Sequence, residues 1–339
     1  MFSLEKIVRE NIQNLQAYSS ARDEYTDSQG TFLDANENPY GEWNRYPDPQ
    51  QKAIKQRLSQ RNAIPSGQIF VGNGSDELID LVFRIFCEPG QDKALIFTPT
   101  YGMYEVSAAI NNVAVVKTPL TADFQIDFDS LRSVLTDKAI KVLFICSPNN
   151  PTGNDIKEID SVLQMFDGVV VVDEAYIDFS TAASMIEKIK KYPNLIVTQT
   201  FSKAWGLAGA RVGSAYASKE IISLLNKVKP PYNVSALNQR AVLEALDNSE
   251  QFERQKAAIL TQRDRLQEQL LQLPIVKKVY PSAANFLLIE VADANQTYAD
   301  LVAQQVITRN RSSVVNNCIR ITIGSEEENQ KLIEALVNI

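Results

Sequence analysis

The chain of 339 residues contains no histidine at all. This absence excludes every mechanism that needs an imidazole from the chain itself, including Ser-His-Asp and Cys-His hydrolysis and metal sites with histidine ligands. Acid–base chemistry must then fall to lysine, tyrosine, aspartate or glutamate, and a lysine released from a Schiff base is a good candidate. Chance is the alternative explanation, because histidine is an uncommon residue.

Cysteine and long apolar runs are also scarce. The three cysteines, Cys87, Cys146 and Cys318, lie far apart and form no CxxC pair, so their spacing indicates neither a disulfide framework nor a zinc site. No apolar run approaches the length of a membrane span. The chain starts with the charged residues Glu5 and Lys6, where a secretory signal would be apolar. We therefore expect a cytoplasmic protein with no metal and no membrane contact.

Basic side chains are fewer than acidic ones, 34 against 41, which leaves a formal net charge of -7. This balance argues against nucleic-acid binding as the main task, because such proteins favour a basic face. Hydrophobic residues make up 45% and charged residues 22%, the ordinary balance of a globular enzyme. The length favours two domains, or one large domain with a smaller companion.

Short β-rich runs alternate with helical patterns from about residue 47 to residue 235. Strands that alternate with helices predict a mostly parallel sheet covered on both faces. The run of valines at 169–172 is apolar on both faces, as a central parallel strand should be. The expected strands span residues 69–72, 94–97, 113–117, 141–146, 169–173, 196–200 and 212–217.

The pattern changes after Pro230 and Pro231. A long, charged, helical stretch is expected from about Ser235 to Leu273, and it is followed by β-rich runs and a closing helix, which predict a smaller α+β domain. Prolines in the polar first 45 residues favour an extended arm there. We expect a large domain at residues 47–235, and an N-terminal arm and a small domain from residues 1–46 and 236–339.

The segment around Lys203 is the most informative one. A lysine can hold an aldehyde cofactor such as pyridoxal 5'-phosphate as a Schiff base, and both Ser202 and Arg211 could reach the phosphate of that cofactor. The alternative is a surface lysine that follows a strand. Function is favoured because nearby glycines indicate that the backbone passes close to another group; they are Gly206, Gly209 and Gly213.

Two other segments carry groups that the same cofactor needs. Asp173 ends the most apolar strand, where a carboxylate needs a positive partner such as a protonated ring nitrogen. Asn150, in an Asn-Pro-Thr-Gly turn, and Tyr176 could donate to the ring oxygen. Each could equally be an ordinary turn residue or a packed tyrosine. Their order along the chain and their positions after strands favour function, because ligands of α/β proteins bind at strand ends.

The segment Gly72–Asp76 joins an expected strand to a helix start, where free amides and the helix dipole can hold a phosphate. A plain helix cap is the alternative. Tyr101 follows another strand and could stack on a ring, or it could be a core tyrosine. Arg320 lies between apolar neighbours in a β-rich run, and from the pattern alone we expect it to face solvent.

Together these motifs resemble those of the class I/II aminotransferases, the fold type I group of enzymes that use pyridoxal 5'-phosphate. The resemblance covers nearly the whole chain and implies an α/β fold, with a mostly parallel central sheet covered by helices and a smaller α+β domain. Narrower segments resemble the branch of that family that acts on histidinol phosphate; they are Tyr18–Arg22, Leu33–Gly41, Asn44–Pro49, Pro99–Tyr104 and Cys146–Gly153.

The resemblance implies a role for each matching residue. Lys203 would hold the cofactor, Asp173 would pair with its ring nitrogen, Asn150 and Tyr176 would bind its ring oxygen, and Tyr101 would stack on the ring. The cofactor phosphate would be bound by Gly74, Ser75, Asp76, Ser202 and Arg211.

The resemblance also implies a shared active site. Tyr46 would reach the phosphate of the partner subunit's cofactor, so the site would need a homodimer. Arg320 would bind the substrate anion, either the phosphate of histidinol phosphate or a carboxylate of L-glutamate, which reverses the expectation from the pattern. Arg309 and Tyr18 would assist at that anion, and Asn38 would line the site.

The implied reaction transfers the amino group of L-glutamate to imidazole acetol phosphate, giving 2-oxoglutarate and histidinol phosphate, a step of histidine biosynthesis. Free Lys203 would move the proton, helped by its proximity. Three alternatives stay open. They are a decarboxylase of the threonine-phosphate type, a broader aromatic or branched-chain aminotransferase, and a non-catalytic binding protein on the same scaffold.

Overall fold

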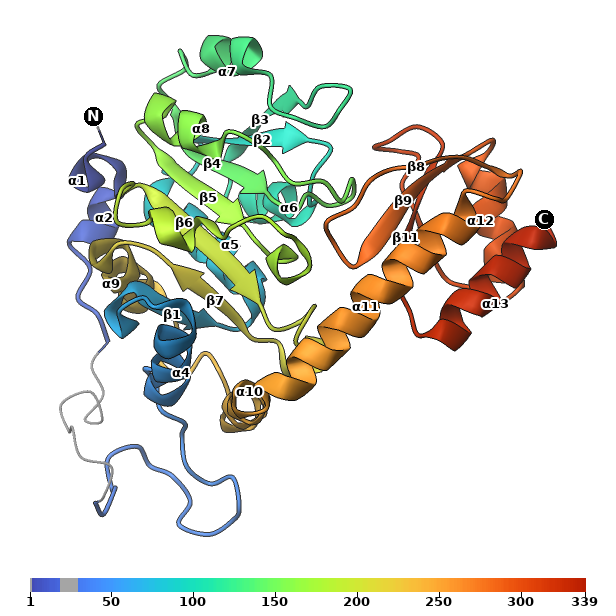
Figure 1. The fold of residues 1–339 in the computed structure, drawn as a ribbon. Coiled ribbons are helices and arrows are strands. Elements are labelled where there is room, and N and C mark those ends of the chain that lie inside the picture. Colours follow the sequence, from blue (N-terminus) through green and yellow to red (C-terminus); the bar gives the residue numbers. More distant parts are fainter. Residues whose placement is uncertain (1, 19–29) are drawn as a thin grey trace.

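The computed structural model describes residues 2–18 and 30–339, and it contains two sheets (Figure 1). The larger sheet has the strand order β1-β7-β6-β5-β4-β2-β3. In it β7 runs antiparallel to β1 and β6, and every other neighbouring pair is parallel. The strands are β1 (Ile69–Gly72), β2 (Lys93–Thr98), β3 (Ala114–Pro119), β4 (Ile140–Cys146), β5 (Val169–Asp173), β6 (Leu195–Thr200) and β7 (Gly213–Tyr216). The expected mostly parallel sheet is confirmed.

The two faces of the larger sheet bury separate apolar clusters. Side chains of a strand alternate between faces, so Val170 and Val172 join one cluster while Val169 and Val171 join the other. Helices cover both clusters, which is why β5 is buried along its whole length. The helices of this part are α4 (Lys52–Asn62), α5 (Gly74–Phe86), α6 (Met103–Ile110), α7 (Phe128–Val134), α8 (Ile159–Met165) and α9 (Lys219–Val228).

The smaller sheet is antiparallel, with the order β10-β11-β9-β8. Its strands are β8 (Val276–Val279), β9 (Phe286–Val291), β10 (Arg309–Asn310) and β11 (Cys318–Thr322). Leu287, Ile289 and Ile319 lie in one apolar cluster with residues of the helices. Because side chains alternate, Leu288, Cys318 and Arg320 face the other way. The helices that pack on this sheet are α11 (Ser249–Leu270), α12 (Ala294–Ala303) and α13 (Glu326–Val337). Helix α10 (Ala236–Asp247) instead packs against α4, and its Val242 lies in an apolar cluster of the larger sheet.

The helical stretch expected between residues 235 and 273 is confirmed, and the chain divides it into two helices, α10 and α11. Asn248 interrupts the helix with φ -109° and ψ 54°, and its side chain accepts a hydrogen bond from the backbone amide of Gln251. Asparagine is among the best helix-starting residues, which explains why α11 begins here. The long helix α11 (orange in Figure 1) then leads from the larger sheet to the smaller one.

The expected extended arm begins later than the sequence indicated. Two single-turn helices, α1 (Leu4–Ile7) and α2 (Glu10–Gln13), come first, and Val8 and Ile12 pack into an apolar cluster of the larger sheet. Residues 30–51 form no helix or strand and extend away from the sheet (Figure 1). Of the Tyr18–Arg22 motif, all but Tyr18 lies outside the described residues. The domain division at residues 47 and 235 stays a prediction.

Within residues 2–18 and 30–339, no helix is both long and apolar enough to cross a membrane.

Candidate active site

A pocket lies where the parallel strands of the larger sheet end. The carboxyl ends of β4, β5 and β6 meet at one edge, because these strands are parallel neighbours. The pocket is lined by Ser75, Asp76, Tyr101, Cys146, Asn150, Asp173, Ala175, Tyr176, Thr200, Ser202, Lys203 and Arg211. The structure therefore brings together most of the cofactor residues expected from the sequence.

Asp173 is buried at the floor of this pocket, with 2% of its surface exposed. Its carboxylate accepts hydrogen bonds from the Tyr104 hydroxyl at 2.7 Å, the Thr198 hydroxyl at 3.1 Å and the Ala175 amide at 3.1 Å. Burial raises the pKa of Asp173, and these hydrogen bonds oppose that rise. Among the described residues no lysine or arginine forms an ion pair with it. A protonated ring nitrogen would supply the missing positive partner.

Neither Tyr104 nor Thr198 was assigned a role from the sequence. Tyr104 is fully buried inside α6, and its ring stacks on Phe144 with the centroids 4.8 Å apart. A buried tyrosine hydroxyl needs a hydrogen-bond partner. That rule was the one available signal, but it could not identify Asp173 as the partner 69 positions away.

Lys203 is exposed to the open pocket, and its amine lies 5.6 Å from the centre of the Tyr176 ring. The surrounding protein atoms desolvate this amine, and the positive charge of Arg320 acts in the same direction, so the pKa of Lys203 is lowered. A lysine with a lowered pKa is a better nucleophile and base near neutral pH.

Arg320 connects the smaller sheet to this pocket. Its guanidinium donates a hydrogen bond to the side-chain oxygen of Asn150, and the Asn150 amide donates to the Tyr176 hydroxyl at 3.3 Å. The guanidinium also lies 5.2 Å from the centre of the Phe286 ring. The expectation of a solvent-facing Arg320 is therefore wrong. The strand alternation that places Ile319 and Ile321 in the core turns Arg320 toward the larger sheet.

A candidate phosphate cradle lies in the same pocket, where Asp76, Ser202 and Arg211 meet. The Asp76 carboxylate accepts hydrogen bonds from Arg211 at 3.3 Å and from the Tyr101 hydroxyl at 3.1 Å, and Arg211 also donates to Ser202 at 3.4 Å. Because the Asp76 carboxylate is occupied by these donors, its backbone amide is the better candidate for binding a phosphate. Gly74, two residues before Asp76, has a positive φ of +76°.

Two glycines keep this cradle open. A Cβ at Gly74 would lie 2.8 Å from an Arg211 nitrogen, and a Cβ at Gly213 would lie 2.6 Å from the Ser75 amide nitrogen. Helix α5 starts here, and its N-cap residue Asn73 makes no side-chain capping hydrogen bond. A plain capping sequence is therefore a poorer explanation than an anion site.

The loop before α5 is held by a residue that the sequence analysis did not single out. Glu77 accepts hydrogen bonds from the Asn73 amide at 2.5 Å and from the Asn233 side chain at 2.8 Å. These contacts tie the cradle to the segment that precedes α10.

The remaining expected residues do not line this pocket. Tyr46 stacks on Tyr232 with the ring centroids 4.3 Å apart, and it lines a separate hollow of the arm. Tyr18 and Asn38 are exposed. Arg309 is also exposed and pairs with Arg320 across β10 and β11. One subunit alone thus leaves Tyr18, Asn38 and Tyr46 outside the candidate site.

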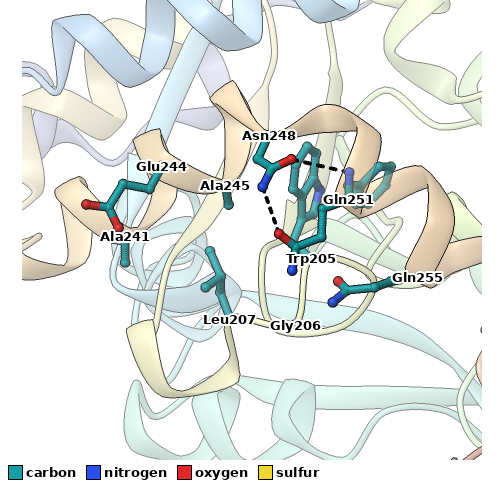
Figure 2. A pocket seen from close by; sticks show the side chains of 10 residues that line it. Trp205, Gly206, Leu207, Ala241, Glu244, Ala245, Asn248, Gln251 and Gln255 are labelled. Atoms are coloured by element: carbon teal, nitrogen blue, oxygen red, sulfur yellow. Dashed lines mark hydrogen bonds between the residues drawn. The ribbon is translucent and has the colours of Figure 1, made fainter.

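A second pocket lies behind the Lys203 loop, between Trp205 and the helices α10 and α11 (Figure 2). Trp205 stacks on Phe252 with the centroids 4.0 Å apart, and the Asn248 amide donates to Gln251 at 2.7 Å. Of the residues that the structure describes, its lining contains Glu244 but no lysine or arginine. We therefore assign the chemistry to the pocket of Lys203 and Asp173, which offers both an amine and an anion cradle.

The amino-acid sequence matches the family described as Aminotransferase class I and II over residues 21–336. Among curated proteins, the histidinol-phosphate aminotransferase of Cytophaga hutchinsonii is 51% identical over 99% of this chain and 99% of its own length.

Solved structures share the fold. The histidinol-phosphate aminotransferase of Clostridium acetobutylicum has a TM-score of 0.80 and 25% identity, and the match covers 87% of this chain and 90% of that one. The enzyme of that name from Sinorhizobium meliloti, in complex with pyridoxal-5'-phosphate, has a TM-score of 0.79 and 24% identity, over 87% of this chain and 82% of that one.

Proposed function

This chain belongs to the aminotransferase class I and II family, and from that premise we propose that it is a histidinol-phosphate aminotransferase. It would transfer the amino group of L-glutamate to imidazole acetol phosphate, giving 2-oxoglutarate and histidinol phosphate in histidine biosynthesis. The observation that carries the proposal is the contact between Arg320 and Asn150, which joins an anion-binding arginine to the pocket of Lys203 and Asp173.

The pocket fits pyridoxal 5'-phosphate, the cofactor that the family uses. The buried Asp173 carboxylate suits a protonated ring nitrogen, and the cradle at Gly74, where a side chain would collide with Arg211, suits a phosphate. When bound, the cofactor supplies an electron sink that stabilises negative charge on the substrate carbon. Tyr101 would lie against the ring, while Asn150 and Tyr176 would face its oxygen. Ser75, Asp76, Ser202 and Arg211 would complete the phosphate site.

Lys203 is the residue that we assign to proton transfer. Its lowered pKa increases the share of neutral amine available as a base. The amine would take the proton from the substrate carbon and return it on the cofactor side, and its fixed position contributes through proximity. Tyr176, whose hydroxyl is within hydrogen-bond distance of Asn150, helps to hold the ring oxygen in place.

Arg320 is assigned to the substrate anion, with Arg309 beside it on the neighbouring strand. One site must accept both the phosphate of histidinol phosphate and a carboxylate of L-glutamate. The planar guanidinium fork can bind either anion through two hydrogen bonds.

The test is an amination assay. Purified protein loaded with pyridoxal 5'-phosphate should form 2-oxoglutarate and histidinol phosphate from L-glutamate and imidazole acetol phosphate. Carbon dioxide release from phosphothreonine, with no need for L-glutamate, would instead support a decarboxylase. Faster amination of aromatic or branched-chain keto acids would support a broader aminotransferase.

We also propose a homodimer with shared active sites, in which Tyr46 reaches the partner subunit's cofactor and Tyr18 and Asn38 approach the partner's substrate. The arm supports this proposal because it exposes an apolar patch, which marks an interaction surface. This arm patch consists of Trp43 and Tyr46 of the arm and Leu237 of α10, which line one hollow and whose exposed fractions range from 49% to 55%.

A mass measurement tests the dimer. Light scattering should give about twice the chain mass of 37.9 kDa. Leu237→Glu should produce monomers and lower activity, because it places a charge in the arm patch. Leu271→Glu is the matched control, since Leu271 is 56% exposed, against 55% for Leu237, and lies outside the patch. A fully active wild-type monomer would contradict the shared site.

The cytoplasm is the proposed location. The three cysteines are buried and free, which suits a reducing compartment. No nucleic-acid or membrane partner is proposed, in line with the acidic net charge.

A further inference from the structure

A third arginine, Arg311, lies beside the two that were assigned to the substrate anion. Arg309 and Arg320 face each other across β10 and β11. The Arg311 amide continues this pairing, because it donates to the Cys318 carbonyl at 2.9 Å. Residues two apart on a strand share a face. The three guanidinium groups therefore emerge on one face of the smaller sheet, the face from which Arg320 contacts Asn150.

These three arginines lack the acidic partners that other arginines of the chain have. Arg45, Arg57 and Arg265 each pair with a carboxylate. In the part of the chain that the structure describes, no carboxylate pairs with Arg309, Arg311 or Arg320.

In two of these arginines, one nitrogen of the guanidinium group is also buried and donates no hydrogen bond to any residue that the structure describes. The Nε atoms of Arg311 and Arg320 are buried and have no hydrogen-bond partner among residues 2–18 and 30–339. Leaving a charged donor buried and unpaired is costly. The pKa of Arg311 is lowered, first by burial and then by the positive charges of Arg320 and Arg309, so the three groups are close enough to repel one another.

A bound anion of high charge would offset the repulsion between these three guanidinium groups. A phosphate monoester carries a charge of about -1.5 to -2 near neutral pH and offers three acceptor oxygens, whereas a carboxylate carries one charge. Two arginines suffice for a carboxylate, and a third adds attraction that mainly a dianion can use. We propose that Arg311 is a specificity-determining residue, which with Arg309 and Arg320 forms a three-arginine site for the substrate phosphate. The identity of the phosphorylated substrate rests on the proposed function.

Steady-state kinetics of the cofactor-loaded Arg311→Gln enzyme test the proposal. We expect the KM for histidinol phosphate to rise about tenfold, the effect of losing one charge-assisted hydrogen bond. The kcat and the KM for L-glutamate should stay within about twofold of wild type, because Arg309 and Arg320 remain. Arg311→Lys, which keeps the charge but loses the fork, should raise the KM for histidinol phosphate less. Arg254→Gln, which removes an exposed arginine of α11, should change neither KM.

Thermal unfolding with inorganic phosphate gives a readout that does not depend on turnover. The cofactor-loaded enzyme is used, so that its own phosphate cradle is filled. Inorganic phosphate should raise the Tm of the wild-type enzyme, and it should raise the Tm of Arg311→Gln by clearly less. Without phosphate, Arg311→Gln should melt no lower than wild type, because the substitution removes repulsion between like charges.

The outcomes separate this inference from the proposed function. An unchanged KM for histidinol phosphate together with an equal phosphate-induced rise in Tm would overturn the three-arginine site. An equal rise in the KM for histidinol phosphate and the KM for L-glutamate would show that Arg311 does not select for phosphate. If wild type does not turn over histidinol phosphate, the proposed function fails, whereas Arg311-dependent stabilisation by inorganic phosphate would still support the anion site.

Discussion

Replacing Lys203 with alanine should lower kcat/KM for transamination by at least about 10⁴-fold, the upper end of what a positioned acid–base group contributes. Lys203 is the single lysine among the described residues that line the pocket. The chain contains no histidine, so no imidazole can take over the proton transfer. The same substitution removes the amine that would hold the cofactor.

Two measurements check this expectation. The amination assay should show no turnover above background, and the purified variant should lack the visible absorbance of the lysine-bound cofactor. Lys219→Ala is the control, because Lys219 is exposed at the start of α9 and should be dispensable. Transamination retained by Lys203→Ala would count against the whole assignment.

Asp173→Asn should lower kcat by about 10²- to 10³-fold and weaken cofactor binding. Breaking a buried ion pair by neutralising one partner costs about 3–5 kcal/mol, and Asp173 is the buried carboxylate that would face the ring nitrogen. The fold should survive, because asparagine has nearly the same shape. Its oxygen can still accept from Ala175 and Thr198, and the Tyr104 hydroxyl can rotate to accept from the new amide.

The next residue in the chain supplies a matched control for this second prediction. Glu174 is also buried, but its carboxylate bonds to Ser184, Met185 and Gln199 and does not line the pocket. Burial raises the pKa of Glu174 to about 7, so glutamine resembles a form that is already populated near neutral pH. Glu174→Gln should leave kcat within a few-fold. If both variants lose activity equally, the loss at Asp173 reflects misfolding.

Much of the larger sheet could be predicted from local pattern. The runs expected at residues 69–72 and 169–173 coincide with β1 and β5, and the other expected strands differ from the observed ones by one or two residues at their ends. The strand-end positions of Asp173, Asn150 and Lys203 then follow, because parallel strands direct their following loops to one edge.

Prediction from the local sequence pattern failed where the structure of one segment depends on a contact with a segment far along the chain. The two-residue strand β10 is too short to show a period, and it forms because β11 offers it a partner. The orientation of Arg320 was wrong for a related reason. The alternation of Arg320 with isoleucines indicates that the arginine and the isoleucines lie on opposite faces of the strand. It does not indicate whether the arginine face meets water or another part of the chain.

The sequence alone determined the chemical inventory of this protein: a lysine, an aspartate, an arginine and a set of glycines at strand ends, with no imidazole. It could do so because strand patterning and turn chemistry depend on near neighbours. Only the tertiary structure decided that the Tyr104 hydroxyl meets Asp173, 69 positions away, and that Arg320 meets Asn150, 170 positions away. Contacts between residues so far apart in the sequence depend on strand order and on the packing of the smaller sheet against the larger one. No local sequence pattern encodes either of these.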